Sequence, residues 1–169
     1  MDLSRRIYEA SFLTGDFTLR SGQTSHFYID KYRFESDPNL LRDIVQAMAA
    51  QLPNEVELLA GLELGGIPIA TALSLETGIP VIFVRKQAKP YGTMRIAEGV
   101  DFSSRRICIV EDVISTGGQV LESAQALRNE GGLVDWVSYV VSRGNETDCL
   151  SQAKLIPIPL LTIDEIAPI

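Results

Sequence analysis

Residues 107–119 read ICIVEDVISTGGQ, and this stretch decides the fold and the place of its site. It opens with an apolar run, residues 107–110, that has the composition of a buried strand. Two adjacent acids, Glu111 and Asp112, come next, and a short turn rich in glycine and hydroxyl groups leads into a helical pattern from Val120. A strand, turn and helix in this order are typical of parallel sheets, which bind ligands beyond the carboxyl ends of their strands.

The acids and the turn have the chemistry of a sugar-phosphate site. Adjacent carboxylates at the end of a buried strand are costly without a partner, and ribose hydroxyls can donate hydrogen bonds to them. In residues 115–119, glycines allow close approach, hydroxyls donate, and the helix N-terminus offers free N–H groups to a phosphate. A plain strand-to-helix turn is the alternative, and it leaves the acidic pair unexplained. The sequence contains neither the Gly-Lys-Ser/Thr ending of a P-loop nor a G-x-G-x-x-G pattern.

Apolar runs and helical patterns alternate along the rest of the chain. Asp37 followed by Pro38 is the usual start of a helix. The expected helices begin near residues 37, 67 and 120 and end near residues 52, 78 and 130. The expected strands are residues 57–62, 80–84, 106–110, 134–141 and 159–163. This alternation predicts an α/β fold in which helices flank both faces of a central parallel sheet.

The segment 17–30, FTLRSGQTSHFYID, departs from this alternation. It reads as two short extended pieces around Ser21 and Gly22, which predicts an antiparallel hairpin outside the main sheet. We expect this hairpin to lie as a lid over the strand ends.

Length, composition and charge exclude several classes of protein. The 169 residues, 46% of them hydrophobic and 22% charged, suit one globular domain. No apolar run approaches the roughly 20 residues of a transmembrane helix, and the charged N-terminus is unlike a signal peptide. Cys108 lies in an apolar run, which predicts a buried, reduced thiol. We therefore expect a cytoplasmic protein that does not associate with membranes, and the net charge of −7 argues against nucleic-acid binding.

Positive charge is concentrated in one part of this acidic chain. The basic residues that fall close together are Arg85, Lys86, Lys89 and Arg95, with Arg105 and Arg106 a little beyond. A local excess of this kind indicates a phosphate-rich ligand, and its alternative is a solvated charged loop.

Residues 107–119 resemble the signature with which type I phosphoribosyltransferases bind phosphoribosyl pyrophosphate (PRPP). The resemblance implies the fold of that family in a single domain, residues 1–169. It also implies that Glu111 and Asp112 bind the ribose hydroxyls and that the turn after them binds the 5-phosphate. The implied contacts to this part of PRPP are Glu111, Asp112, Val113, Ile114, Ser115, Thr116, Gly117, Gly118 and Gln119.

Two further segments resemble the pyrophosphate-binding parts of the orotate phosphoribosyltransferases. Residues 61–74, GLELGGIPIATALS, resemble a binding loop with its helix, and residues 84–93, VRKQAKPYGT, resemble the start of a mobile catalytic loop expected over about residues 86–99. The implied catalytic residues are Arg85, Lys86 and Lys89, and Lys89 would neutralise charge on the departing pyrophosphate. The implied pyrophosphate contacts are these three residues with Tyr91, Glu63, Leu64, Gly65 and Gly66. Tyr91 stands where bacterial members have a histidine, and it can donate a hydrogen bond but carries no positive charge.

The base-binding part of the same family is matched more loosely. Residues 17–30 resemble the family's N-terminal hood, expected over about residues 1–35, and residues 141–144 resemble its base-reading turn. Arg143 is implied to hold the orotate carboxylate in two hydrogen bonds. The implied orotate contacts are Thr116, Arg143, Phe27, Tyr28 and Arg20. Ser142 replaces an aspartate that is usual in the family, Arg20 replaces a lysine, and the single histidine, His26, has no partner that indicates a catalytic role.

The resemblance implies a glycosyltransferase of the pentosyltransferase class. It would transfer phosphoribosyl from PRPP to orotate, giving orotidine 5′-monophosphate and pyrophosphate on the route to UMP. It implies Mg²⁺ held mainly through PRPP, with no protein side-chain ligand, and a homodimer whose mobile loop crosses to the neighbouring site. Two alternatives stay open: a transferase for uracil or a purine, because of Ser142 and Tyr91, and a catalytically silent PRPP sensor, against which Lys86 and Lys89 weigh.

Overall fold

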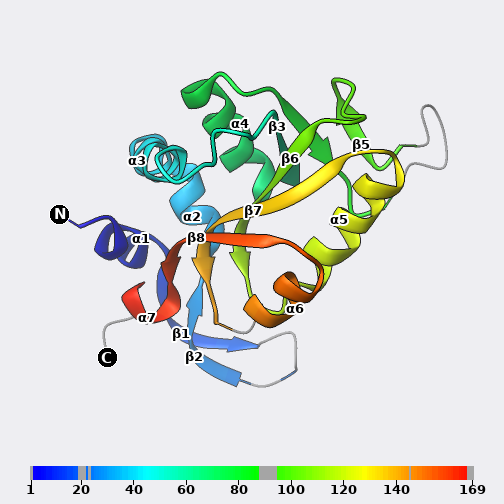
Figure 1. The fold of residues 1–169 in the computed structure, drawn as a ribbon. Coiled ribbons are helices and arrows are strands. Elements are labelled where there is room, and N and C mark those ends of the chain that lie inside the picture. The colour runs from blue at the N-terminus through cyan, green and yellow to red at the C-terminus, as the bar shows by residue number, and fades with distance from the viewer. Residues whose placement is uncertain (1, 19–21, 23, 88–94, 145, 167–169) are drawn as a thin grey trace.

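The computed structural model describes residues 2–18, 22, 24–87, 95–144 and 146–166, and a six-stranded sheet forms its centre (Figure 1). The strand order is β5–β4–β3–β6–β7–β8. The strands are β3 (Leu58–Leu62), β4 (Val81–Val84), β5 (Ala97–Gly99), β6 (Arg106–Ile114), β7 (Leu133–Ser142) and β8 (Ile156–Thr162). All neighbours are parallel except β5, which runs antiparallel to β4 at the edge. The predicted α/β fold with a mainly parallel sheet is confirmed.

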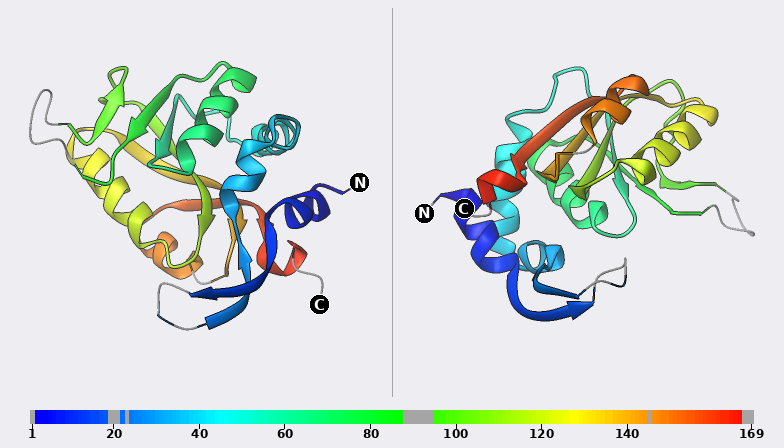
Figure 2. Two further views of the ribbon diagram at one scale, coloured as in Figure 1. Left: turned by 180° about the vertical axis from the view of Figure 1, so that it is seen from behind. Right: turned by 90° about the horizontal axis from the view of Figure 1, so that it is seen from below.

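Helices cover both faces of this sheet (Figure 2). They are α1 (Leu3–Ser11), α2 (Lys31–Ser36), α3 (Pro38–Ala49), α4 (Gly66–Thr77), α5 (Gly118–Asn129), α6 (Thr147–Gln152) and α7 (Ile163–Ile166). Leu58 and Ala60 of β3 belong to a hydrophobic cluster with α5 and α6, whereas Leu59 belongs to a second cluster with α3 and α4. Successive residues of a strand thus fill opposite layers. In the described part of the chain, no helix has the length and apolar character needed to cross a membrane.

The predicted hairpin lies outside the main sheet. Strands β1 (Phe12–Thr18) and β2 (Thr24–Ile29) pair antiparallel, below the sheet edge in the view of Figure 1. The helices on either side of it, which the sequence assigned to the hood as well, pack into the body of the domain. Ile7 of α1 and Phe34 of α2 are both buried in the cluster that also holds α3 and α4.

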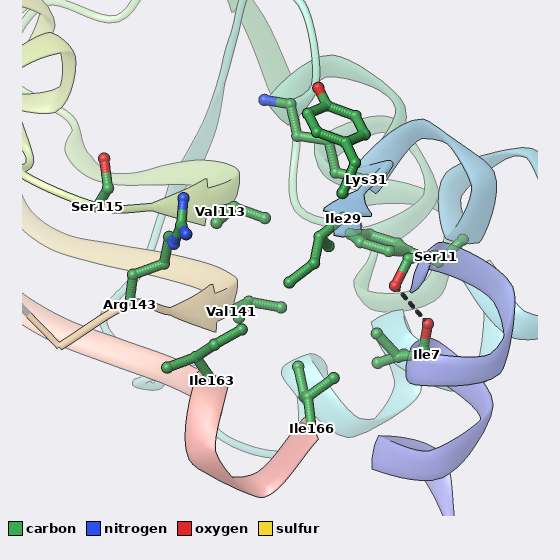
Figure 3. Close-up of a pocket in the computed structure, with 12 residues that line it drawn as sticks. Ile7, Ser11, Ile29, Lys31, Val113, Ser115, Val141, Arg143, Ile163 and Ile166 are labelled. Atoms are coloured by element: carbon green, nitrogen blue, oxygen red, sulfur yellow. Dashed lines mark hydrogen bonds between the residues drawn. The ribbon is translucent and has the colours of Figure 1, made fainter. Parts of the chain in front are cut away.

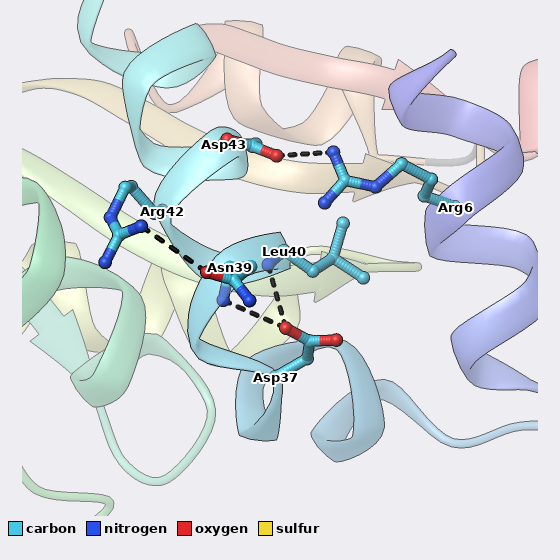
Figure 4. A network of polar contacts seen from close by, with 6 residues as sticks. All are labelled: Arg6, Asp37, Asn39, Leu40, Arg42 and Asp43. Carbon is cyan, nitrogen blue, oxygen red and sulfur yellow. Dashed lines mark hydrogen bonds and ion pairs between the residues drawn. The ribbon is translucent and has the colours of Figure 1, made fainter. Parts of the chain in front are cut away.

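The start of α3 follows the pattern that the sequence predicts. The Asp37 side chain accepts hydrogen bonds from the N–H groups of Asn39 at 2.9 Å and Leu40 at 3.0 Å (Figure 4). Arg6 of α1 forms an ion pair with Asp43 of α3, which ties the N-terminal helix to the body of the domain.

Strand β6 is longer than the sequence predicts, and both acids lie within it rather than after it. Its ladder with β3 ends at Val110, opposite Gly61. Its ladder with β7 continues as far as Ile114, opposite Ser142. Pairing with β7 therefore extends the strand through the acids, whereas pairing with β3 ends at the residue that directly precedes them.

Residues 97–99 form strand β5, although the sequence places them in a mobile loop over residues 86–99. Ala97 is buried and pairs with Val84 of β4. Ala97 is buried when residues 97–99 pair with the edge of β4, and a solvated loop would expose it. These three residues are therefore not part of a loop, contrary to the prediction.

Cys108 of β6 is fully buried, as predicted. Burial raises the pKa of its thiol to about 12, so the group stays neutral. Cys149 is also a free cysteine.

Two glycines let α4 begin directly against β6. A Cβ on Gly66 would stand 2.2 Å from the Val110 carbonyl oxygen, and a Cβ on Gly65 would stand 1.7 Å from Asp112 Oδ2. The helix can approach the acids this closely only because neither residue has a side chain.

We predict that Gly66→Ala destabilises the fold, because the added methyl group meets backbone that cannot move independently. Overpacking of this kind costs about 1–3 kcal/mol, which corresponds to a melting temperature lower by roughly 3–10 °C. Gly118→Ala is the matched control, since a Cβ there meets nothing nearer than Thr116 Oγ1 at 4.0 Å. Equal melting temperatures of the two variants would contradict the close approach.

Candidate active site

Four strand ends bring the predicted site residues to one edge of the sheet. Because β3, β4, β6 and β7 run parallel, their carboxyl ends lie side by side. Glu63 follows β3, Arg85 follows β4, Ser115 follows β6 and Arg143 follows β7. The structure thus collects at one edge residues that are far apart in the chain.

The two acids of β6 are buried next to each other. Asp112 is fully buried and Glu111 is 8% exposed. Asp112 Oδ1 accepts a hydrogen bond from the Val113 N–H at 2.5 Å, and Glu111 Oε2 accepts one from the Asp112 N–H at 2.9 Å. These bonds fix the direction of both carboxyl groups and leave further lone pairs for a ligand, because each oxygen carries two.

Lys31 balances the charge of Asp112, and the sequence analysis missed it. It is the first residue of α2, and its Nζ lies 2.7 Å from Asp112 Oδ2. Glu35, one turn later on α2, is 8% exposed, and its Oε1 has no hydrogen-bond partner among the described residues. Among the described residues, the single positive charge of Lys31 therefore lies beside a cluster of three carboxyl groups, those of Glu35, Glu111 and Asp112.

This excess of acids changes the protonation of the cluster. Burial, with the hydrogen bond and the charge of Asp112, raises the pKa of Glu111 to about 9. Burial and the charge of Asp112 raise the pKa of Glu35 to about 8. Burial by itself would lower the pKa of Lys31, but the hydrogen bond to Asp112 and the charges of both β6 acids outweigh it and raise that pKa. At neutral pH, Lys31 is a cation and the two glutamates are mainly neutral acids, which donate as well as accept hydrogen bonds.

The turn after β6 encloses a small cavity, here called the turn cavity, of about 240 Å³. It is lined by Lys31, Glu111, Val113, Ile114, Ser115, Thr116, Gly117, Gly118, Gln119 and Val120. Gly117, with φ of 77°, has the left-handed conformation that favours glycine and directly precedes α5. Leu121 donates a hydrogen bond to the Gly117 carbonyl, so the earlier N–H groups of α5 remain available to an anion.

Glu63 ties the loop after β3 to both neighbouring loops. Its Oε2 accepts a hydrogen bond from the Lys86 N–H at 3.1 Å, and its carbonyl accepts one from Gln119 Nε2 at 3.1 Å. Beside it lies the basic cavity, of about 530 Å³, lined by Arg85, Lys86, Gln87, Ile96, Gly118, Gln119, Glu122, Ser123 and Ala126. Gly118 and Gln119 line this cavity and the turn cavity alike, so the predicted phosphate and pyrophosphate contacts adjoin.

A third cavity, the hairpin cavity, has a volume of about 250 Å³ and lies between the sheet edge and the hairpin (Figure 3). Its apolar lining is Ile7, Ile29, Phe34, Val113, Val141, Ile163 and Ile166. Its polar lining is Ser11, Tyr28, Lys31, Ser115 and Arg143. Arg143 and Lys31 enter it from different sides, one from the end of β7 and the other from α2 (Figure 3). An apolar cavity with two cations suits a flat, anionic ligand.

Some predicted contacts lie elsewhere or outside the described part of the chain. Thr116, predicted to touch the base, lines the turn cavity rather than the hairpin cavity. Leu64 is 59% exposed, beside the buried Gly65. Three predicted contacts lie outside the described residues, namely Lys89, Tyr91 and Arg20, and so does the side chain of Phe27.

The chain matches none of the protein-family models that were searched. A relative from Nocardioides sp., named orotate phosphoribosyltransferase, is 53% identical over 131 residues, which are 78% of this chain and 73% of the relative. The chain belongs to the orotate phosphoribosyltransferase family.

Solved structures of orotate phosphoribosyltransferases have the same fold. That of the Mycobacterium tuberculosis H37Rv enzyme in complex with Fe(III) dicitrate matches with a TM-score of 0.87 and 28% identity, over 98% of this chain and 97% of that chain. A structure of the same enzyme in complex with PRPP matches with a TM-score of 0.80 and 26% identity, over 97% of this chain and 96% of that chain.

The turn after β7 is built around a buried glutamate. Ser142, which replaces the family's usual aspartate, donates a hydrogen bond to Glu146 Oε1, and the Tyr139 hydroxyl donates another at 2.9 Å. Glu146 is fully buried and accepts both hydrogen bonds at the same carboxylate oxygen. Cys149 Sγ, in the helix that follows, donates to the Thr116 carbonyl at 3.0 Å. The turn that carries Arg143 is thus joined to the turn after β6, and the only sequence signal for it was the serine that replaces aspartate.

We predict that Glu35→Gln makes the stability less dependent on pH. The pKa of Glu35 is 4.5 when unperturbed and about 8 in the folded protein. Between these values the folded state holds a proton that the unfolded state has released, so stability falls as pH rises. Glutamine imitates the neutral acid and removes this contribution. Melting temperatures measured at about pH 5.5 and about pH 8.5 should therefore fall less in the variant than in the wild type.

Glu55→Gln, at an exposed glutamate, is the control and should behave like the wild type. If Glu35→Gln loses as much melting temperature between the two pH values as the wild type does, the folded protein does not hold that proton.

Proposed function

We propose that the chain transfers the phosphoribosyl group of PRPP to orotate, giving orotidine 5′-monophosphate and pyrophosphate on the route to UMP. One observation carries the proposal: the turn cavity and the hairpin cavity share Lys31, Val113 and Ser115. The first has Glu111 and the donors of the turn, which suit a ribose phosphate, and the second has the apolar walls and cations that suit orotate. Substrates in the two cavities would meet at the shared residues.

The donor half of the site follows from its hydrogen-bonding groups. Glu111 and Asp112 bind the ribose 2- and 3-hydroxyls, since both carboxyl groups are held in place and have acceptor positions left. Residues 115–119 bind the 5-phosphate through hydroxyls and the first N–H groups of α5. The structure of the Mycobacterium tuberculosis enzyme in complex with PRPP supports PRPP as the donor.

The reaction breaks the bond between the ribose C1′ and the pyrophosphate oxygen and forms a bond from C1′ to N1 of orotate, and the N1 proton leaves to the pyrophosphate or to solvent. Positive charge develops on C1′ and negative charge on the leaving pyrophosphate, so the protein acts by placing reactants and stabilising charge. Arg85 and Lys86 bring positive charge to the basic cavity. Resemblance to the family supports Lys89 and Tyr91 as pyrophosphate contacts together with residues 63–66, and Lys89 as the charge that neutralises the leaving group.

Arg143 holds the orotate carboxylate, because its guanidinium enters the hairpin cavity and can donate two parallel hydrogen bonds. Tyr28 lines the same cavity. Resemblance to the family supports Phe27 and Arg20 as further orotate contacts.

We expect Mg²⁺ to enter the site bound to PRPP. In the described residues, no group of three or more His, Cys, Asp and Glu side chains can hold a metal ion. The nearby carboxyl groups offer little negative charge to a metal ion, because Asp112 is paired with Lys31 and Glu111 is mainly neutral. An ion held mainly through phosphate oxygens fits this donor set. It would neutralise charge on the pyrophosphate.

The quaternary structure and the compartment are part of the same proposal. Family resemblance supports a homodimer in which the loop around Lys89 crosses to the neighbouring site. Two free cysteines, one of them fully buried, support a reducing compartment such as the cytoplasm.

A transferase for uracil or a purine is the alternative within this fold. Two cations that line one apolar cavity favour an anionic base, because they can pair with a negative charge that uracil and the purines lack. A silent PRPP sensor is the other alternative, and the cations of the basic cavity weigh against it.

We predict that the wild type consumes orotate when PRPP and Mg²⁺ are present, followed by ultraviolet absorbance. Arg143→Ala should lower kcat/KM for orotate by at least about a hundredfold, because two charged hydrogen bonds are lost. Lys89→Ala should instead lower kcat, since its charge acts on the leaving group.

Arg42→Ala is the matched control, because Arg42 lies on α3 and its described partner is Asn39. It should retain full activity. No consumption of orotate by a wild type that still binds PRPP would contradict the proposed function, and a screen of other bases would then separate a different transferase from a sensor.

A further inference from the structure

Lys31 stands where the ribose site and the base site meet. It lines both the turn cavity and the hairpin cavity, and its Nζ lies 2.7 Å from Asp112 Oδ2. The backbone of α2 holds it there: Lys31 opens the helix directly after the hairpin, and Phe34 anchors that helix in the core with no exposed surface. Its position is therefore set by the fold and not by a mobile loop.

The ammonium group of Lys31 has more donors than Asp112 uses. An ammonium carries three N–H donors and no acceptor. Its ion pair with Asp112 Oδ2 occupies at most one of them, and the side chain is 36% exposed, toward the two cavities that it lines. Two donors are therefore open to a ligand. Its pKa is raised by the surrounding acids, so the group is charged when the substrates arrive.

We propose that Lys31 is a second orotate-binding residue, which pairs with the base carboxylate on the side opposite Arg143 and selects for a base that carries one. This inference rests on the proposed function. N1 of orotate must face the ribose carbon, and the carboxylate is on the ring carbon next to N1. A cation in contact with the ribose-binding Asp112 is therefore beside this edge of the base.

A purely structural role predicts a different pattern of effects. If Lys31 only neutralised Asp112, removing its charge would weaken the ribose site and raise the KM for PRPP, with equal effects on all bases. If Lys31 pairs with the carboxylate, the loss is specific to orotate. Uracil, which has the same ring without the carboxylate, separates the two roles.

The experiment compares Lys31→Met, Lys31→Arg and the wild type in steady-state kinetics, with uracil as an inhibitor competing with orotate. Methionine keeps the length of the side chain without its charge. Loss of a hydrogen bond to a charged group should raise the KM for orotate at least about tenfold, while the inhibition constant of uracil changes less than about twofold. Lys31→Arg, which keeps the charge, should recover most of the affinity for orotate.

Lys154→Met is the matched control, because Lys154 is exposed and lines none of the three cavities. Thermal unfolding establishes that each variant is folded. The inference is overturned if Lys31→Met leaves the KM for orotate unchanged, if orotate and uracil weaken by the same factor, or if a folded Lys31→Arg loses as much as Lys31→Met. Each of these outcomes requires orotate turnover by the wild type, whose absence would instead contradict the proposed function.

Discussion

The structure depends on holding two adjacent carboxyl groups, Glu111 and Asp112, inside the protein at the end of its central strand. Water is excluded from both, so their charge has to be met by protein groups or by protons. Lys31 supplies a cation in contact with Asp112, and the proton of Glu111 removes the second charge at neutral pH. The acceptor positions that remain on these two carboxyl groups suit a ligand rich in hydroxyl groups.

The surrounding architecture follows from that constraint. Helix α4 begins with two glycines because a side chain at Gly65 would occupy the space of Asp112. Helix α2 is anchored so that Lys31 reaches the acids from the hairpin side. The same lysine then faces the cavity that Arg143 enters from β7, so one cation joins the two substrate sites. On the far side of the site, Glu146 and Cys149 connect the turn after β7 to the turn after β6.

The sequence predicted the features that are formed by residues contiguous in the chain. The strand, the acids and the glycine turn of residues 107–119 are neighbours in the chain, so their chemistry was visible without a fold, and the alternation of strands and helices placed them at the sheet edge. Lys31 and Glu35 could not be found in this way, because only the packing of α2 brings them to Asp112. The length of β6 was also missed, since it depends on a ladder with β7 that local composition does not reveal. The contact of Ser142 with Glu146 was missed as well, because only the fold of the turn after β7 brings the two side chains together.

The central claim is that the buried acids bind the ribose of PRPP. The most direct measurement is calorimetric titration of the wild type and of Asp112→Asn with PRPP and Mg²⁺, with pyrophosphate titrated in parallel. Asparagine keeps the shape of the side chain and removes its charge, so the account predicts PRPP affinity lower by at least about tenfold. Pyrophosphate, which has no ribose, should bind both proteins alike. Unchanged affinity for PRPP in a folded Asp112→Asn would contradict the account.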